Sequence, residues 1–478
     1  MPQAQADRYI DPLRVLHERP EECANITFTA AQKTALAALF IAVVAGLIFA
    51  LLPTLIVINA FFVLFYVLQS GYKFYLVWRS LGRQAAIMVS PEQMAAVPDE
   101  DLPTYTILIP LFREAAVLPK LVRGLCELDY PADKLEIQLL LEEDDRETVD
   151  AAQAMDLPPQ FRRVVVPESY PRTKPKACNY GLALCNTDLL VIYDAEDVPE
   201  RDQLRKAACA FRNLPPSVVC LQAKLNYFNP RQNLQTRWFT AEYSVWFDLF
   251  LPGLTASRAP IPLGGTSNHF RVAALQELGG WDPFNVTEDC DLGVRLFKHG
   301  YITQMIDSTT WEEANANFFS WLRQRSRWVK GYIQTYLVHM RRPLRLVRQL
   351  GLPGWFSFQM TVGGSIVSFL ANPIYWLLTG VWLITQSPTI NAMFPTAIYV
   401  PGVFCLLLGN FVFVYLNVAG CMNRGYYDLV KHTLLTPLYW LMMSWAAYKA
   451  AAQLIVKPHY WEKTEHGLTT EAPPGGPE

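Results

Sequence analysis

Charged residues are absent from two long intervals of this 478-residue sequence. No Asp, Glu, Lys or Arg occurs between Lys33 and Lys73, and none occurs between Arg348 and Arg424. Buried helices of soluble proteins rarely lack charge over such lengths, whereas a membrane-spanning helix needs about 20 consecutive apolar residues. These absences therefore predict an integral membrane protein with two spans in each interval.

Other absences narrow the class further. The formal net charge is only −2, and a nucleic-acid partner needs a strong basic excess, so we expect no nucleic acid. The nine cysteines form no CxxC pair and no Cys/His pattern of a zinc site, and a reducing cytoplasm disfavours disulfides. The first apolar run is too long for a cleaved signal peptide, so we expect a membrane anchor there.

These intervals define an expected layout. Pro53 and Asn59 offer a break between the first two spans. The predicted parts are an N-terminal tail (1–32), two transmembrane helices (33–78), a cytoplasmic catalytic domain (79–310), interfacial amphipathic helices (311–350), two further transmembrane helices (358–420), a third C-terminal apolar segment (430–457) and a C-terminal tail (458–478). Residues 1–32 and 467–478 are expected to be flexible.

The charged loops predict the orientation. Basic residues follow the second and the fourth span: Lys73, Arg79, Arg83, Arg424 and Lys431. By the positive-inside rule, residues 79–350 lie in the cytoplasm and the uncharged loop QSPTINAMF lies outside, as in a bacterial inner membrane. Lys449 interrupts the apolar stretch 433–456, which either spans the membrane or lies along its surface; the second arrangement is favoured.

Short β-rich runs alternate with helical segments between the two membrane blocks. Strands are predicted at 104–110, 135–141, 162–167 and 188–194, with a helix at 174–185. This alternation is typical of parallel βαβ units in a doubly wound α/β sheet. In such sheets, ligands bind at the carboxyl ends of the strands.

Two acidic motifs, EEDD (142–145) and DAED (194–197), follow predicted strands and should meet in one crevice. Crowded carboxylates repel each other unless a cation neutralises them, and Mg²⁺ or Mn²⁺ prefers carboxylate and phosphate oxygens. Asp194 and Glu196 are the predicted metal ligands, with Asp197 as a substitute for Glu196. The alternative for either motif alone is a solvated acidic turn.

Two further motifs add chemistry to this crevice. TED (287–289) places Glu288 and Asp289 at a probable helix start that Thr287 could cap, where an acid suits a general base or, alternatively, only the helix dipole. QRSRW (324–328) offers Arg327 to a diphosphate and Trp328 to a sugar ring. Its alternative is an amphipathic helix on anionic lipid, and both can hold.

The ordered set EEDD, DAED, TED and QRSRW, enclosed by membrane helices, resembles the inverting family 2 glycosyltransferases of the cellulose synthase and hyaluronan synthase type. The resemblance covers residues 100–335 closely and the membrane blocks by layout. It implies a GT-A (Rossmann-like) catalytic domain, a UDP-sugar donor and Mg²⁺ or Mn²⁺. It implies UDP contacts from Pro110, Glu114, Glu143, Asp144, Lys174, Asn179, Asp194, Gln324 and Arg327. It also implies acceptor contacts from Gly265, Thr266 and Trp328, and Asp289 as the base beside Glu288.

Two departures and one tail motif leave questions open. Glu196 stands where the family has aspartate, so the second metal ligand is Glu196 or Asp197, and EEDD leaves open whether Glu143 or Asp144 meets the nucleoside. The tail PHYWEKTEHG (458–467) resembles a C-terminal signature of bacterial synthase-like members. Its aromatic residues and Lys463 face the active site or, alternatively, anchor the chain at the membrane surface.

The resulting hypothesis is a processive inverting transferase that builds a β-glucan or similar exopolysaccharide from a UDP-sugar and secretes it. Its expected partners are the growing glycan, the lipid bilayer and accessory secretion subunits. The first alternative is transfer of a single sugar to a lipid or polyprenyl phosphate. The second is a non-catalytic membrane receptor or translocation partner that keeps the fold.

Overall fold

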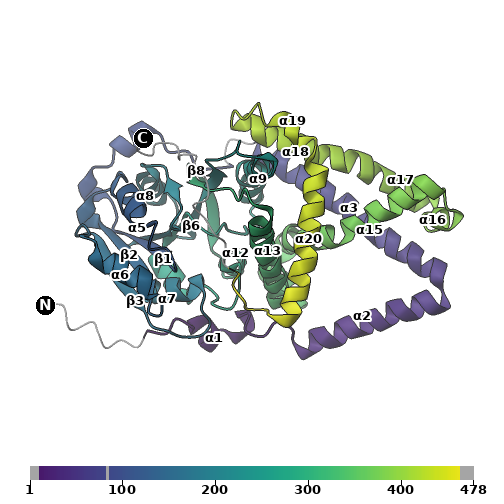
Figure 1. The fold of residues 1–478 in the computed structure, drawn as a ribbon, viewed down its shortest axis with the longest axis horizontal. Helices are drawn as coiled ribbons and strands as arrows, with labels where there is room; N and C mark the ends of the chain where they lie inside the picture. Colours follow the sequence, from purple (N-terminus) through teal and green to yellow (C-terminus); the bar gives the residue numbers. More distant parts are fainter. Residues whose placement is uncertain (1–9, 82–84, 463–478) are drawn as a thin grey trace.

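The computed structural model describes residues 10–81 and 85–462, in which an eight-stranded sheet lies beside a set of long apolar helices (Figure 1). The strand order is β3-β2-β1-β4-β7-β6-β8-β5. The strands are β1 (Tyr105–Leu111), β2 (Leu135–Glu142), β3 (Phe161–Val166), β4 (Leu189–Ile192), β5 (Val198–Pro199), β6 (Val218–Tyr227), β7 (Asn268–Arg271) and β8 (Ile302–Glu312). The predicted α/β domain between membrane helices is confirmed.

The first half of the sheet is parallel, as the βαβ pattern predicts. Strand β1 pairs with both β2 and β4, so that Ile107 lies between Ile137 and Val191. Alternate residues of β1 enter two different apolar clusters, Ile107 on one face and Leu108 on the other. Both faces of the sheet are therefore covered, which explains why these strands are almost continuously apolar.

Helices cover this domain on both faces. The helices and helical turns of the domain are α4 (Pro91–Ala95), η2 (Asp99–Asp101), α5 (Leu118–Cys126), η3 (Ala132–Lys134), α6 (Arg146–Ala154), α7 (Lys174–Leu184), α8 (Gln203–Asn213), α11 (Val272–Glu277) and α12 (Glu288–Lys298). The long helix α13 (Phe318–His339) follows β8 and leads towards the membrane helices.

Strand β7 differs from a wholly parallel sheet, because it runs antiparallel to β4 and to β6. Between β6 and β7 the chain forms α9 (Leu234–Val245), the π-helical turn η4 (Trp246–Phe250) and α10 (Leu251–Ala256). This helical segment starts and ends at the same edge of the sheet, where the carboxyl ends of β4 and β6 lie. The segment GGTS (264–267), which directly precedes β7, therefore lies at that edge.

Four helical stretches are long and apolar enough to cross a membrane: Ala30–Phe49, Leu51–Ser80, Pro343–Thr385 and Thr396–Asn423. They comprise α2 (Ala30–Phe49), α3 (Leu51–Ser80), α14 (Pro343–Phe358), η5 (Gln359–Gly363), α15 (Gly364–Thr385), α17 (Thr396–Phe404), η6 (Cys405–Gly409) and α18 (Asn410–Asn423), with the short α16 (Pro388–Ala392) at the turn. The chain is therefore a membrane protein.

The break in the first helical pair is not where the sequence predicts it. The helices meet at Ala50, and Pro53 lies in the first turn of α3, where the missing N–H of proline costs no hydrogen bond. Asn59 lies inside α3 and is buried, and its Nδ2 donates to the Met393 carbonyl at 3.1 Å. Its polarity therefore serves a contact between helices rather than a turn.

The last long helix, α20 (Thr436–Val456), follows the short α19 (Val430–Thr433) and packs against α13 and α15. It is not among the four membrane-span candidates in the described part of the chain. In Figure 1 it runs crosswise to α15 and α17. Lys449 forms an ion pair with Glu462 at 3.0 Å, so this charge is matched locally.

The prediction of a flexible N-terminal tail is wrong for residues 10–29. This segment contains α1 (Arg14–Glu18) and the turn η1 (Pro20–Glu22), and Val15, Cys23 and Ala24 are buried. Polar contacts to residues more than 250 positions away hold it in place. Residues 1–9 and 463–478, which include Lys463, lie outside the described residues.

Candidate active site

A cavity of about 420 Å³ lies at the carboxyl ends of β1, β2 and β4, between α7, α9, α12 and α13. Most of the predicted site residues line it: Pro110, Glu114, Asp144, Lys174, Asp194, Glu196, Gly265, Thr266, Glu288, Asp289, Gln324, Arg327 and Trp328. Residues from seven separate segments of the chain therefore converge on one crevice. Their individual roles stay predictions.

The turn after β4 carries the acids of the DAED motif. The amide of Asp197 donates to the Asp194 carbonyl at 3.1 Å, and the Asp194 amide donates to Asp197 Oδ2 at 2.7 Å. Thr266 Oγ1 also donates to Asp197 Oδ2. Asp197 Oδ1 is buried without a hydrogen-bond partner. Asp197 thus folds the turn, while Asp194 and Glu196 line the cavity.

Lys174, at the start of α7, forms an ion pair with Asp194 of this turn. Its Nζ donates to Asp194 Oδ1 and, at 2.8 Å, to the Gly265 carbonyl. Burial alone would lower the pKa of Lys174, but the carboxylates of Asp194 and Glu288 outweigh burial and raise it. The lysine therefore stays protonated and supplies fixed positive charge where a diphosphate would lie.

Glu288 and Asp289 form the first turn of α12. Burial raises the pKa of both carboxyls, and the negative charge of Asp289 raises that of Glu288 further. Asp289 Oδ1 accepts a hydrogen bond from the Cys290 amide at 2.7 Å, which favours its ionised form. Asp289 is therefore the stronger acid of the pair, so that near neutral pH it is the carboxylate while Glu288 keeps the proton.

Thr287 precedes α12, but its predicted capping hydrogen bond is not formed. Its Oγ1 is buried without a partner and lies against Gly331 of α13. A Cβ at Gly331 would lie 2.2 Å from that oxygen, so glycine is what lets α13 approach the start of α12 this closely. Gly265 lies near the same helix start, where a Cβ would be 3.4 Å from Asp289 Oδ2, an ordinary contact distance.

The QRSRW motif lies on α13 with its side chains at the cavity. Gln324 Oε1 accepts from Asn315 Nδ2 at 3.0 Å, which orients the amide. Trp328 stacks on Tyr243 with ring centroids 6.2 Å apart and an interplanar angle of 27°. The Arg327 guanidinium lies 4.4 Å from the ring centre of Trp461. Burial lowers the pKa of Arg327, and the carboxylates of Glu288 and Asp289 oppose that effect.

Three predicted residues do not line the cavity: Asp197, whose contacts in the DAED turn are described above, and Glu143 and Asn179. Glu143 accepts a hydrogen bond from the Glu168 amide at 3.0 Å. Asn179 is buried, and its side chain bonds the backbone of Trp281 and the carbonyl of Pro12. Both contacts are structural, so neither residue is placed to touch a nucleotide; Asp144, which lines the cavity and pairs with Arg172 at 2.6 Å, is the better-placed acid of EEDD.

The cavity also contains residues that the motifs did not reveal. Glu312 ends β8, and burial and then the carboxylates of the DAED turn raise its pKa. Glu242 accepts hydrogen bonds from Arg325 and, at 2.8 Å, from the Tyr439 hydroxyl. Trp461 belongs to the tail motif, and its place in the cavity agrees with the first of the two expectations for those aromatic residues. In the sequence, the only local indication that Glu312 belongs to the site is its position at the end of a β-strand.

The cavity suits a divalent cation bound together with a diphosphate. Burial and then the neighbouring carboxylates raise the pKa of Asp197 and Glu312, and a buried Asp197 oxygen lacks a partner, so negative charge is incompletely balanced. Among the residues described, no three His, Cys, Asp or Glu side chains are arranged to hold an ion by themselves. The arrangement therefore fits an ion that takes one or two ligands from Asp194 and Glu196 and the rest from phosphate oxygens and water.

Comparison with known proteins gives a family and several relatives. Residues 189–452 match the profile described as "Glycosyl transferase family group 2". The chain is similar to a probable glycosyltransferase, YdaM, of Bacillus subtilis, with 27% identity over 268 residues, or 55% of this chain and 63% of that protein. It is also similar to the β-monoglucosyldiacylglycerol synthase of Synechocystis, with 28% identity covering 59% of this chain and 61% of that protein.

A third relative is glucomannan 4-β-mannosyltransferase 2 of Arabidopsis thaliana, with 28% identity over 49% of this chain and 46% of that protein. The chain thus spans less than two thirds of the length of each of these relatives.

Proposed function

Because the chain belongs to glycosyl transferase family group 2, whose profile covers more than half of it, we propose that it transfers a hexosyl group from a UDP-sugar to a glycan acceptor at the membrane surface, with inversion at the anomeric carbon. The chain is a membrane-embedded glycosyltransferase. The donor, the acceptor, repeated elongation and secretion are the proposal.

The observation that carries the proposal is the two-ended cavity. One end is lined by Pro110, Glu114 and Asp144 from the strand edge where nucleotides bind in α/β sheets. The other end reaches Ser365 and Phe369 of the membrane helix α15. A donor and an acceptor can therefore approach the acids between them from opposite sides.

The proposed mechanism is a single displacement. Asp289 is the ionised member of the buried pair on α12, so it takes the proton from the acceptor hydroxyl as that oxygen attacks the anomeric carbon. Lys174 and Arg327 stabilise the negative charge of the departing UDP, as fixed charges in a partly dry site do best. A Mg²⁺ or Mn²⁺ ion held by Asp194 and Glu196 would neutralise part of the diphosphate charge.

The membrane end of the cavity supports a sugar as acceptor. Tyr243, Trp246 and Trp328 offer flat apolar faces, and the Glu242 carboxylate lies among them. Aromatic faces stack on sugar rings, and a carboxylate accepts hydrogen bonds from sugar hydroxyls. The name of the glucomannan mannosyltransferase relative agrees with a glycan acceptor. We therefore favour elongation of a polysaccharide, which would leave between the membrane helices.

A lipid acceptor is the second candidate. Phe369 and Met443 line the membrane end of the cavity. Phe369 belongs to the apolar helix α15, and Met443 belongs to α20, which packs against α15. The β-monoglucosyldiacylglycerol synthase relative carries a lipid in its name. An acyl chain between these helices with its hydroxyl at Asp289 would use the same catalytic acids for one transfer.

A donor and acceptor panel tests the proposal. Purified protein in lipid nanodiscs is given radiolabelled UDP-sugars with Mg²⁺ or Mn²⁺, together with either an oligosaccharide or diacylglycerol. We expect UDP release coupled to a ladder of products that linkage-specific hydrolases digest. A single glycolipid product would replace polymerisation by the lipid alternative. Absence of UDP release with every donor would contradict the UDP-sugar assignment, and GDP-sugars are the next donors to offer.

The orientation is also part of the proposal. Basic residues follow α3 and α18, which supports a catalytic domain on the cytoplasmic side of a bacterial inner membrane. In proteoliposomes sorted by protease accessibility of the catalytic domain, UDP-sugar added on that side should label a product protected inside the vesicles. Product on the side of addition would contradict secretion without affecting the transfer reaction.

A further inference from the structure

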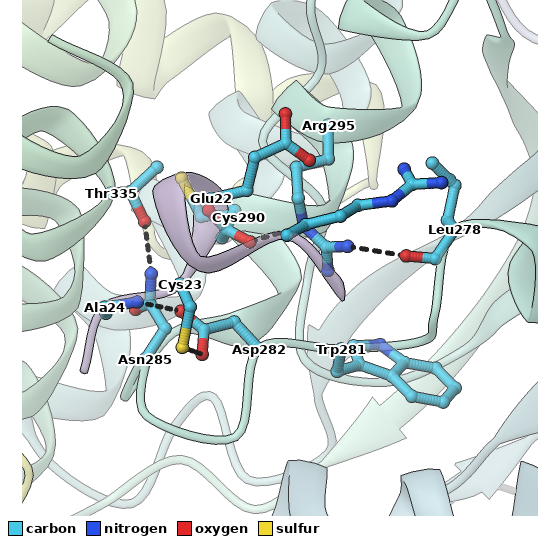
Figure 2. Close-up of polar contacts among 12 residues, drawn as sticks. Glu22, Cys23, Ala24, Leu278, Trp281, Asp282, Asn285, Cys290, Arg295 and Thr335 are labelled. Atoms are coloured by element: carbon cyan, nitrogen blue, oxygen red, sulfur yellow. Dashed lines mark hydrogen bonds and ion pairs between the residues drawn. The ribbon is translucent and has the colours of Figure 1, made fainter. Parts of the chain in front are cut away.

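Residues 10–29, named here the N-terminal strap, cross the back of the helix that carries Asp289. The strap ends in Thr29, which caps the first membrane helix α2. Figure 2 shows Glu22, Cys23 and Ala24 of the strap, on the purple ribbon, beside Asp282, Asn285 and Arg295 of the catalytic domain. No step of the proposed mechanism uses this group of contacts.

The strap binds the loop that leads into α12. Asp282 is fully buried, and its carboxylate accepts hydrogen bonds from the Ala24 amide at 2.6 Å and the Cys23 thiol at 3.2 Å. The same carboxylate accepts from the Phe284 amide at 3.0 Å. One buried carboxylate, five residues before Thr287, therefore ties two strap residues to this loop.

The strap also binds the far end of α12. Glu22 forms an ion pair with Lys298 at 2.5 Å and contacts His299 at 3.4 Å. Both Glu22 and Lys298 are more than nine-tenths buried. Because a buried charge that loses its partner lowers the stability of the fold, we infer that these contacts hold the strap against the helix.

Helix α12 is thereby fixed along its rear face. Asp291 lies two positions after Asp289, about 200° around the helix, and it faces away from the cavity. Asp291 pairs with Arg295 at 2.7 Å and contacts His339 of α13 at 3.0 Å, and Arg295 donates to the Gly280 carbonyl at 2.7 Å. The strap, α12 and α13 therefore form one buried polar unit behind the catalytic carboxylates.

We propose that the N-terminal strap is a positioning element for Asp289, and that Glu22 and Asp282 are the positioning residues through which it acts. The inference rests on the proposed role of Asp289 as the base. It adds that the first membrane helix is linked to the catalytic helix through residues 10–29. A shift of the base by about 1 Å is enough to slow a reaction up to about 10²-fold, so loosening the strap should lower turnover.

The kinetic test compares two glutamates of the same segment. Glu22→Gln removes the charge that faces Lys298, whereas the matched control Glu18→Gln removes an exposed charge that pairs only with Arg14 within the strap. We expect Glu22→Gln to lower kcat about 10-fold with the KM for the donor unchanged, and Glu18→Gln to match the wild type. Lys298→Met should lower kcat similarly, and the double variant should lose no more than either single one, because both break one contact.

A second measurement does not depend on activity. Cys23 in the strap and Cys290 beside Asp289 are fully buried, as are Cys178 and Cys220 in the core of the sheet domain. N-ethylmaleimide labelling followed by peptide mass spectrometry should show Cys23 and Cys290 reacting together in Glu22→Gln while Cys178 and Cys220 stay protected. Cys126, which is exposed, should label in every variant.

Each outcome decides the inference. Unchanged labelling and unchanged kcat in Glu22→Gln would overturn it, as would labelling of Cys23 without Cys290, because the strap would then open without moving α12. Labelling of all buried cysteines would mean global unfolding and would also overturn it. A wild-type protein without transferase activity would refute the proposed function, and labelling of Cys23 with Cys290 would still show that the strap fixes α12.

Discussion

Two groups of buried carboxylates lie on opposite sides of α12, and they differ in how their charge is balanced. Behind the helix, Glu22 pairs with Lys298, and Asp291 pairs with Arg295 and His339. Asp282, whose pKa is raised by burial and by the charge of Asp291, accepts hydrogen bonds from backbone amides. In the cavity, the carboxylates of the DAED turn, Glu312, Glu288 and Asp289 share Lys174 and Arg327. Burial and then the charge of neighbouring carboxylates raise the pKa of Asp197, Glu288 and Glu312. One set is completed by the fold, and the other is not.

This difference separates structure from chemistry. A buried acid with its own cation holds elements in place, and breaking that pair is costly. A cluster of buried acids that outnumbers its cations, with several raised pKa values, is typical of a site that a ligand completes. In the proposed mechanism, acidic residues three positions or fewer apart on α12 therefore serve the reaction on one face and the architecture on the other.

Removal of the base should have the largest effect on catalysis. We expect Asp289→Asn to lower the transfer rate by about 10²–10⁴-fold, because the acceptor hydroxyl then has no proton acceptor in place. Binding of UDP should be retained, since Lys174 and Arg327 are unchanged. UDP release and isothermal titration with UDP measure the two quantities. A variant with substantial turnover would refute the assignment of the base.

Removal of a carboxylate from the rear face should instead lower stability. Asp291→Asn leaves Arg295 buried without its charge partner, and we expect a loss of about 3–5 kcal/mol in the free energy of unfolding. The control is Asp428→Asn, which breaks an exposed pair with Arg231 at 2.8 Å and should cost less than about 1 kcal/mol. Denaturant unfolding in detergent measures both. Equal losses of stability in Asp291→Asn and Asp428→Asn would contradict the structural role of the buried acids behind α12.

The sheet and the acids of the cavity were predictable for one reason. The strands of the parallel half are short β-rich runs, acids follow β2 and β4, and strand ends of one direction share an edge. The direction of β7 was not predictable, because four residues, Asn268–Arg271, carry no sign of the strand beside which they pair. Glu312 and Glu242 lack a motif, so only the folded chain brings them to the cavity.

The N-terminal strap shows the opposite limit. Residues 10–29 have no apolar period and contain several charges, so composition alone predicts a flexible tail. Their order comes from contacts such as Ala24 to Asp282, which join positions 258 residues apart. The motif around Asn179 predicted a contact with the nucleotide, whereas the side-chain amide of Asn179 donates hydrogen bonds to the carbonyls of Trp281 and Pro12. A local sequence pattern does not reveal contacts between residues that lie more than a hundred positions apart in the sequence.

A divalent ion should neutralise part of the excess negative charge in the cavity, and it should not affect the carboxylates of Glu22, Asp282 and Asp291 behind α12. With Mn²⁺ and UDP at about 100 times their joint dissociation constant, we expect the free energy of unfolding to rise by about 2.7 kcal/mol. Asp194→Asn should lose most of this gain. Glu242→Gln, an acid from the acceptor end of the same cavity, is the matched control and should keep it. An unchanged gain in Asp194→Asn would contradict the metal assignment.

The dependence of activity on pH distinguishes the two acids on the catalytic face of α12. Burial raises the pKa of Asp289 from its ordinary value to about 6, and the base must be ionised, so kcat/KM should fall about tenfold per pH unit below pH 6 and level off above it. Glu288 has the higher pKa and is still protonated while Asp289 titrates. Glu288→Gln, which resembles that protonated form, should therefore leave the acid limb at the same pH. If the limb moves or disappears in Glu288→Gln, then Glu288 is the base and the assignment within the pair is reversed.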